Sequence, residues 1–415
     1  MARRFSRKPP GLFSAPEETK EEVLDKTPKH WARRSAVGLV LGAVGAAGAE
    51  LAPLGPAAST NLDLSAWTND FKFSLWNQEF SVRSGMGYKD NVTLSSSAAR
   101  GSGYWVAGGE VMVFRLPSGG WNFSAFGSFL NLGYFDKSTG VNNEQSGLAL
   151  AQVTKDLGSD WKMGLSGTYL YQDQVLDVSA AETSQFTIGE VLGHTAIGRW
   201  FVRKDFKPWW VEAEASVTRQ WLASPLDSFW QAGPRLTLGR SYGHGSELAV
   251  SYQYSRLAYD SRTQVDELGQ EIPDTALRFQ SQGGELGWHQ VWDSARHWQT
   301  LTKLGADLNR DNAAGYFDFW QYHLTEQARF RAGTWEITAQ GRLAYYDYPV
   351  QTITVGDLTA AFRRKIGLSA GVGVQKNLSK KLIVFGSYSY DRSLSNAPDD
   401  QYVANSVQAG LEFRF

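Results

Sequence analysis

The chain has 415 residues, no cysteine and a formal net charge of −1. These numbers exclude a disulfide framework, a thiolate metal site and a cysteine nucleophile. A net charge of −1 also gives no electrostatic reason for the protein to bind nucleic acid or an anionic surface. No stretch reaches the roughly 18–20 apolar residues of a membrane-spanning helix. The aromatic load is nevertheless heavy, at 16 Trp, 17 Tyr and 22 Phe, and there are 42 Gly. This mixture suits closely packed β-strands.

The N-terminal region has the parts of a secretory signal. An arginine pair at 33–34 precedes a short apolar run, and a small-x-small site follows at 47–49. The run is too short and too rich in glycine to span a membrane. We interpret residues 1–49 as an extension followed by a cleavable signal peptide; the alternative is a buried Ala/Gly helix. Residues 50–79 are then a periplasmic leader of uncertain structure.

From about residue 80 to the C-terminus, one pattern repeats. Stretches of about ten residues alternate apolar with polar or small side chains, and turn residues separate them. A tilted strand of about this length crosses a bilayer. The pattern predicts about sixteen strands, with fourteen to eighteen possible. Their predicted ranges are 80–90, 104–115, 121–134, 146–155, 161–172, 188–201, 208–221, 229–241, 247–259, 278–292, 298–309, 316–331, 335–347, 363–376, 381–392 and 402–415.

The connections between these strands alternate in length. Short connections fall at 117–120, 158–160, 204–207, 243–246, 293–297, 332–334 and 377–381, and longer ones lie between them. This layout is typical of an outer-membrane barrel, with short periplasmic turns and longer extracellular loops. The sheet must close because every backbone polar group in a bilayer needs a partner within the protein. The sequence therefore predicts an all-β fold, a transmembrane antiparallel up-and-down β-barrel over 80–415.

Residue parity assigns the two faces of each strand. In the range 335–347, Trp335, Ile337 and Leu343 share one face, and Glu336 and Arg342 share the other. A soluble β-sandwich would also alternate, with its polar face outside. A tryptophan follows five of the short turns, which predicts an interfacial belt at one membrane face. The five are Trp121, Trp161, Trp209, Trp298 and Trp335.

The polar face supplies candidates for the lining of a pore. Both signs of charge occur in similar number, which predicts weak ion selectivity. The alternative for each residue is structural, because such groups often pair with one another across strands. The candidates are Lys162, Glu212, Glu214, Arg235, Glu247, Glu285, Lys303, Asp307, Arg329, Glu336, Arg342, Glu412 and Arg414.

Signals for other chemistry are weak. Three histidines lie in predicted strands, His194, His289 and His323, but no local spacing identifies a nucleophile oriented by a base. No metal signature is present, and no basic–aromatic patch indicates nucleic acid. The sequence therefore predicts no catalytic residue, no metal, no cofactor and no nucleic-acid partner.

Two segments carry a resemblance to known proteins. The last strand, with Leu411, Phe413 and Phe415 at alternating positions, resembles the C-terminal signal that the barrel-assembly machinery of Gram-negative outer membranes reads. "GYKDNVTLSS" and "GSYSYDRSLSNAPDDQYVANSVQAGLEFRF" resemble the putative β-barrel porin families of Gram-negative bacteria. This resemblance implies an outer-membrane location, contact with outer-membrane lipid, recognition of the last strand during insertion, and a possible homo-oligomer.

These observations favour a porin-like channel for passive diffusion of small polar solutes, with no enzymatic activity. Loop 260–277 is the candidate constriction by its length and charge. Three alternatives remain open: an export or secretion barrel for polysaccharide or protein that works with periplasmic partners, an outer-membrane enzyme, and a structural or adhesive barrel with a plugged lumen.

Overall fold

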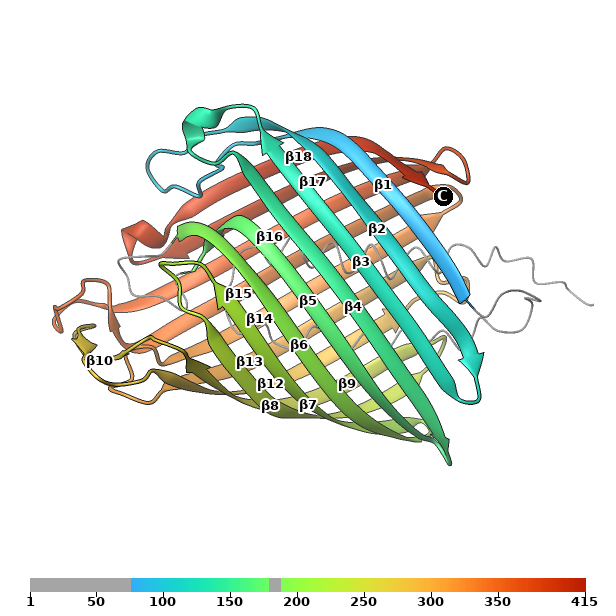
Figure 1. Ribbon diagram of the computed structural model, residues 1–415, viewed down its shortest axis with the longest axis horizontal. Coiled ribbons are helices and arrows are strands. Elements are labelled where there is room, and N and C mark those ends of the chain that lie inside the picture. Colours follow the sequence, from blue (N-terminus) through green and yellow to red (C-terminus); the bar gives the residue numbers. More distant parts are fainter. Residues whose placement is uncertain (1–75, 179–187) are drawn as a thin grey trace, which may run out of the picture.

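The computed structural model describes residues 76–178 and 188–415 (Figure 1). The predicted signal peptide, and the predicted leader as far as residue 75, lie outside the described residues. Within these ranges, sixteen antiparallel strands follow one another around a closed barrel, and β1 pairs with β18 to close it. A two-stranded hairpin, β10 with β11, stands apart from this sheet. The predicted fold class is confirmed.

The strand bounds agree with the sequence pattern to within a few residues at most ends. The barrel strands are β1 (Trp76–Lys89), β2 (Ser102–Ser118), β3 (Trp121–Tyr134), β4 (Asn143–Gly158), β5 (Trp161–Asp177), β6 (Ile188–Phe206), β7 (Trp209–Leu222), β8 (Phe229–Tyr242), β9 (Ser246–Tyr259), β12 (Arg278–Val291), β13 (Trp298–Asp311), β14 (Phe319–Ala332), β15 (Trp335–Thr352), β16 (Phe362–Asn377), β17 (Leu382–Ser395) and β18 (Tyr402–Arg414). The small hairpin is β10 (Gln264–Val265) and β11 (Glu271–Ile272).

Three strands run five residues past their predicted ends. β5 continues beyond residue 172 to Asp177, β6 continues beyond 201 to Phe206, and β15 continues beyond 347 to Thr352. β1 begins at Trp76, inside the predicted leader. Ladder pairing with a neighbouring strand carries β5 and β6 past the point where the apolar alternation fades. Alternation alone therefore underestimates the length of these strands.

The connections divide by length between the two ends of the barrel. Short turns, the start of β1 and the C-terminus lie at one end, which is the periplasmic end (Figure 1). The long connections lie at the extracellular end and carry two short 3-10 helices, η3 (Lys137–Thr139) and η4 (Pro398–Asp400). No helix in the described part of the chain has the length and apolar character needed to cross a membrane.

The closing seam between β1 and β18 depends on close backbone approach. Gly85 faces Gly410 across this seam. A methyl group built at either position would overlap a backbone carbonyl oxygen of the opposite strand, so glycine is needed at both. The chain end is also held, because the Phe415 N–H donates to the Phe80 carbonyl oxygen at 3.0 Å. The last residue therefore belongs to the sheet and is not a free tail.

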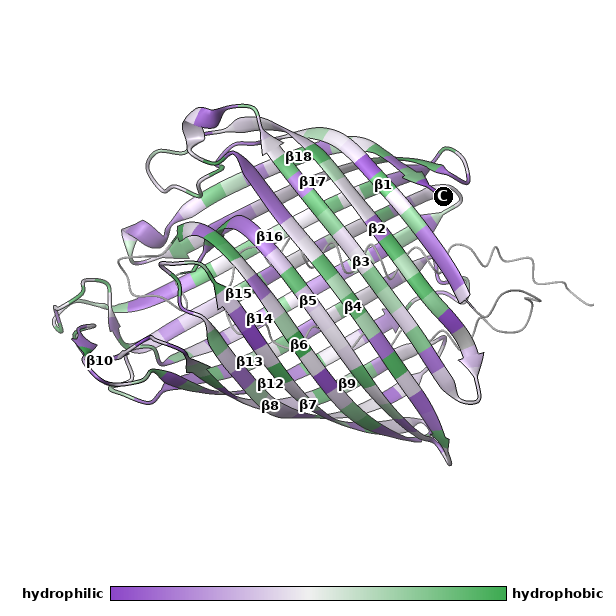
Figure 2. Ribbon diagram, viewed as in Figure 1, coloured by the Kyte–Doolittle hydropathy of each residue, from purple (hydrophilic) through white to green (hydrophobic). Residues whose placement is uncertain are grey.

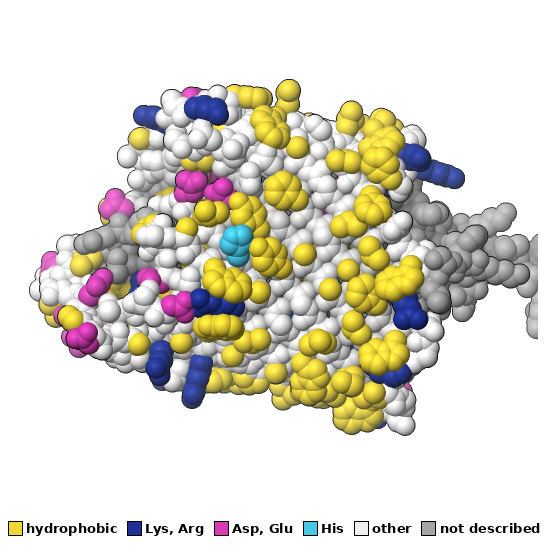
Figure 3. All heavy atoms as spheres, viewed as in Figure 1, with side chains coloured by type: hydrophobic (Ala, Val, Ile, Leu, Met, Phe, Trp, Pro, Cys, Tyr) yellow, Lys and Arg dark blue, Asp and Glu magenta, His cyan; other side chains and the backbone are white. Residues whose placement is uncertain are grey.

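The outside of the barrel is apolar. Outward side chains such as Met86, Leu165 and Val250 are 68%, 61% and 55% exposed. Apolar residues recur along the strands in Figure 2, and Figure 3 shows hydrophobic side chains over the strands with Lys and Arg near both ends. Exposing this much apolar surface to water would be costly at about 25 cal/mol per Å², whereas a bilayer accommodates it. The molecule is a barrel of the outer-membrane type.

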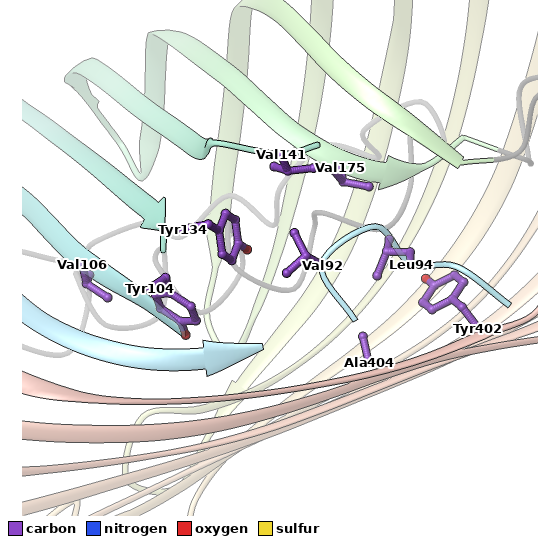
Figure 4. Close-up of a cluster of buried hydrophobic side chains, with 9 residues drawn as sticks. All are labelled: Val92, Leu94, Tyr104, Val106, Tyr134, Val141, Val175, Tyr402 and Ala404. Carbon is purple, nitrogen blue, oxygen red and sulfur yellow. The ribbon is translucent and has the colours of Figure 1, made fainter. Parts of the chain in front are cut away.

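Buried apolar clusters lie inside the extracellular end of the barrel. The cluster in Figure 4 joins strand ends to loops: Val92 and Leu94 of the β1–β2 connection pack with Val175 of β5 and Tyr402 of β18. Its members are Val92, Leu94, Tyr104, Val106, Tyr134, Val141, Val175, Tyr402 and Ala404. The hydrophobic core of this protein therefore sits at the mouth.

Candidate functional site: the lumen and its mouth

The predicted lining residues occupy inward-facing positions of the barrel wall. Glu214 pairs in register with Arg235 across β7 and β8, and both are less exposed than the apolar residues beside them in the chain. The same parity holds for every candidate, because each alternates with outward apolar or small neighbours. Whether these residues line a conducting path stays a proposal.

The sequence patterns missed several charged residues of the inner wall. β6 has ambiguous parity in sequence, yet its odd residues face inward, and they include Arg199 and Arg203. Arg83 of β1 and Glu110 of β2 also face inward and form an ion pair. Opposite charge on neighbouring predicted strands is a signal that could have found the Arg83–Glu110 pair.

One group of charges lies together on the inner face of β8, β12, β13 and β14. Glu285 lies 3.2 Å from Arg235, 3.8 Å from Lys303 and 3.8 Å from His323, measured from a carboxylate oxygen to a side-chain nitrogen. His323 also lies 3.3 Å from Asp307. We call these five residues the charged band. Both signs compensate within it, so the band supplies no field of one sign to select an ion.

Predicted lining residues nearer the periplasmic end also form ion pairs. Glu412 lies 2.6 Å from Arg414 and 3.8 Å from Arg83. Glu336 lies 3.1 Å from Arg331. Glu412, Arg414 and Glu336 therefore pair with other charges of the wall, as the residues of the charged band do. This pairing is the structural role that the sequence analysis gave as the alternative to lining a pore.

The inner face of β16 and β17 is lined by small residues. Most inward positions in the middle of these two strands carry glycine or serine, and Asp391, which faces Ser369, is the charged exception. The small residues are Gly367, Ser369, Gly371, Gly373, Ser387 and Ser389. The inner wall is therefore uneven, with long charged side chains on one side and almost none on another.

The β5–β6 hairpin projects beyond its neighbours at the extracellular end. β4 stops pairing with β5 at Asp173, and β7 stops pairing with β6 at Gly193. β5 and β6 continue to pair with each other as far as Asp177 and Ile188. The described end of this hairpin has no ladder partner outside the hairpin, and its Leu176 and Val178 pack against Leu226 of the β7–β8 connection.

An ion pair shows which strand of the wall the end of the β5–β6 hairpin contacts. Lys365 of β16 donates to Asp177 at 2.6 Å, and each side chain is only 2% exposed. In the described barrel, six strands separate β5 from β16 in one direction and eight in the other. A sixteen-strand barrel is roughly 30 Å across, so two wall residues this far apart cannot touch. The hairpin must cross the mouth to reach β16.

A second buried pair lies beside the first one. Arg363 of β16 forms an ion pair with Asp400 at 2.6 Å, with exposures of 0% and 1%. Arg363 also donates to the Gln351 side chain at 2.8 Å. Buried charges need partners of this quality because their desolvation is costly. These contacts fix η4 and the end of β15 to the wall that receives the hairpin.

The predicted constriction, loop 260–277, takes a different position. It forms the β10–β11 hairpin, and its Val265 and Leu277 are buried against Phe279 and Phe317. These partners belong to β12 and to the connection after β13, so the loop packs on its own side of the mouth. Its role as a constriction stays a prediction, and the β5–β6 hairpin is the segment that crosses.

The three strand histidines do not gather into one site. His194 faces outward from β6, and its Nδ1 lies 2.6 Å from the Tyr169 hydroxyl oxygen. His289 and His323 face inward, and His323 belongs to the charged band. Among the described residues, no group of His, Asp and Glu could hold a metal ion.

A repeated contact marks the periplasmic rim. The first residue of a strand is a tryptophan, and a cation from the neighbouring strand lies over its ring at 4.8–5.9 Å. We call these contacts the rim pairs, and each joins two residues in direct register. They are Trp76–Arg115, Trp121–Lys155, Trp161–Lys204, Trp209–Arg240 and Trp335–Lys376. Trp298 instead packs against Phe330, with ring centroids 4.4 Å apart and ring planes tilted by 35°.

Of the comparisons with known proteins, only the one with solved structures found proteins similar to this chain. No family model matches it, and no curated relative was found. It is similar to OccAB4 of Acinetobacter baumannii, with a TM-score of 0.43 and 9% identity over 84% of this chain and 100% of that one. It is also similar to the anion-selective porin from Comamonas acidovorans, with a TM-score of 0.39 and 12% identity over 82% and 99%.

A third similar structure is a bacterial polysaccharide outer membrane secretin, with a TM-score of 0.39 and 11% identity over 81% of this chain and 98% of that one. Identity this low carries no information about substrate or activity.

Proposed function

We propose that the protein is an outer-membrane channel through which small polar solutes diffuse passively, without enzymatic activity. The observation that supports this most is the pairing of an apolar outer surface with an inner wall of charged and small polar residues. A lumen of this kind holds water, and a barrel of this strand number is wide enough for it.

The inner wall suggests which property of a solute, its size or its charge, would decide whether it passes. Charges of both signs compensate in the charged band, so cations and anions would pass with similar ease. The β5–β6 hairpin and its buried contact with Lys365 narrow the path at the mouth. Solute size would then matter more than solute charge.

Recording single channels in planar bilayers tests this proposal. The purified protein should give steady conductance with weak ion selectivity, and liposomes that contain it should swell faster in small sugars than in large ones. Deleting residues 262–274 tests whether loop 260–277 also narrows the path, in which case conductance rises. Complete absence of conductance in the intact protein and in the deletion variant would contradict the channel.

One observation favours a second candidate, a barrel closed at its mouth. The ion pairs Lys365–Asp177 and Arg363–Asp400 are almost inaccessible to solvent, as expected where side chains fill the opening. A closed barrel would show no conductance until the Lys365–Asp177 pair is broken. Recording the D177A variant beside the wild type therefore separates an open channel from a closed one.

We also propose that residues 33–49 direct export and that Leu411, Phe413 and Phe415 form the assembly signal. The three assembly residues alternate on the outward face of β18 and are 42–69% exposed. Replacing Phe415 by Gln should slow insertion, because it removes the last outward aromatic side chain. A mature N-terminus at Glu50 would support cleavage after Ala49.

A further inference from the structure

Three arginines lie together on the outer surface at the extracellular edge of the apolar exterior. Arg256 of β9, Arg278 of β12 and Arg310 of β13 all face outward and are exposed. Arg256 and Arg310 both pair in register with Gln280 of β12. Neighbouring strands lie about 4.8 Å apart, so the backbones of Arg256 and Arg310 are only about 10 Å apart. We call these three residues the arginine patch.

The position of the patch relative to the bilayer follows from the same register. Gln282 pairs with Tyr254 on one side and with Leu308 on the other, and Leu308 pairs with Trp320. Apart from Gln282, the residues of this row are aromatic or apolar, and they belong to the outward surface of the barrel. The row Arg256–Gln280–Arg310 lies one step beyond it, at the depth where lipid headgroups begin.

The guanidinium groups of the patch lack the acidic partners that neighbouring arginines have. At the extracellular edge of the barrel, Arg219 lies 2.5 Å from Asp260 and Arg364 lies 3.1 Å from Asp347. Within the described chain, no carboxylate forms an ion pair with Arg256, Arg278 or Arg310.

The polar neighbours of the patch do not neutralise its charge. The Arg256 Nε donates to the Tyr254 hydroxyl at 2.7 Å. The Arg278 backbone N–H takes the Asn312 side chain as its acceptor, which leaves the guanidinium group itself available. Burial raises the pKa of the Asp318 carboxyl, and the nearby charge of Arg310 opposes that rise. Asp318 does not form an ion pair with Arg310 and instead accepts the Asp311 N–H at 2.7 Å.

We propose that the arginine patch binds the phosphate groups of a lipid in the outer leaflet. Guanidinium groups recognise phosphate through paired N–H donors, and a cation near a membrane surface attracts anionic headgroups. The apolar surface directly below the patch would receive the acyl chains of the same lipid. A free phosphate ion would satisfy the arginines but would gain nothing from that surface.

Native mass spectrometry of the full-length protein in detergent tests the proposal. Phosphatidic acid is the probe, because its headgroup is a phosphate monoester, and phosphatidylcholine is the comparison lipid. The wild type should retain phosphatidic acid in preference to phosphatidylcholine. The double variant R256Q/R278Q should bind it about thirtyfold more weakly, since each cation near a membrane surface contributes about 1 kcal/mol and every 1.4 kcal/mol is a factor of about ten.

A matched control removes the same charge elsewhere at the extracellular end. Arg100 and Lys137 lie in the β1–β2 and β3–β4 connections and are exposed, so the variant R100Q/K137Q should retain phosphatidic acid like the wild type. Equal retention by R256Q/R278Q and the wild type would overturn the proposal. Loss of the lipid on adding millimolar inorganic phosphate would also overturn it, because the site would then bind the free ion. Unchanged heat-shifted gel mobility confirms that each variant is a folded barrel.

Discussion

At the periplasmic rim, tryptophans and cations meet across neighbouring strands, hairpin after hairpin, whereas at the extracellular mouth the decisive contact joins strands from opposite sides of the barrel. A rim pair such as Trp335–Lys376 connects two residues in direct register. Lys365 and Asp177 at the mouth are 188 residues apart in the chain.

This difference shows how the interactions that stabilise the folded barrel are divided between its two ends. The tryptophans of the rim pairs are 41–50% exposed. Each pair is therefore weak, at about 0.5–1 kcal/mol for a cation–π contact at an exposed site, and the pairs gain their effect by repetition. The mouth holds buried ion pairs and the apolar clusters, where the loss of a single partner is expensive. Substitutions at the mouth should therefore have larger effects than substitutions at the periplasmic rim.

The largest effect is expected from breaking the pair at the mouth. D177A leaves the Lys365 ammonium group buried without this partner, which should destabilise the crossing hairpin by about 3–5 kcal/mol. Released from the far wall, the hairpin should move aside, and single-channel conductance should rise. The double variant D177L/K365M removes both charges and should be milder. Equal conductance in D177A and the wild type would place the hairpin outside the conducting path.

The next effect concerns the β10–β11 hairpin. Leu277 is fully buried in its cluster, so L277A should loosen loop 260–277 at a cost of about 2–4 kcal/mol. Hydrogen exchange of residues 260–277 measures this directly. Leu358 lies in another extracellular connection and is 55% exposed, and L358A should leave exchange unchanged. If both variants behave alike, the loop is held by something other than this packing.

A smaller effect is expected at the periplasmic rim. K376Q removes the cation over the Trp335 ring, and the barrel should lose at most about 1 kcal/mol of stability to urea in vesicles. W335A should cost more, because the indole also leaves the membrane interface. Trp298 has Phe330 in place of a cation, so W298A is the matched comparison without a cation–π term. A K376Q cost as large as that of D177A would reverse the contrast between the two ends.

The smallest effect is a pH dependence in one periplasmic turn. Asp293 accepts the N–H groups of Trp298 at 3.0 Å and His297 at 3.1 Å, and these bonds hold the pKa of its carboxyl below the ordinary value. A lowered folded-state pKa means that the stabilisation is present above the unfolded pKa of about 3.9 and is lost as the pH falls. After correction for the intrinsic exchange rate, the amides of the turn should be less protected at acid pH than at neutral pH, and D293N should remove that dependence.

Much of the barrel was predictable from sequence because its determinants are local. Alternating residues, as in Trp335 to Leu343, report which face meets lipid, and short turns report which strands are neighbours. The same parity placed Glu285 and Asp307 on the inner wall. It did not reveal that Glu285 has three basic neighbours there, because their meeting depends on the register between strands.

Local pattern failed where the alternation itself was weak. His194 could not be assigned to a face from sequence, and the register of β6 turns it outward beside Tyr169. Length and charge favoured loop 260–277 as the constriction, which stays a prediction, and they gave no sign that the β5–β6 hairpin crosses the mouth. Nothing near Asp177 in the chain indicates that its partner is on β16.

The sequence by itself determined a closed barrel, its strand positions, its inner and outer faces and its two unlike ends. Each of these follows from side-chain alternation and turn chemistry, which act over a few residues. Only the tertiary structure decided what the mouth is made of. Closing the sheet brings residues such as Asp177 and Lys365 within reach of each other, and a charge buried at 2% exposure must then find a partner wherever the fold provides one.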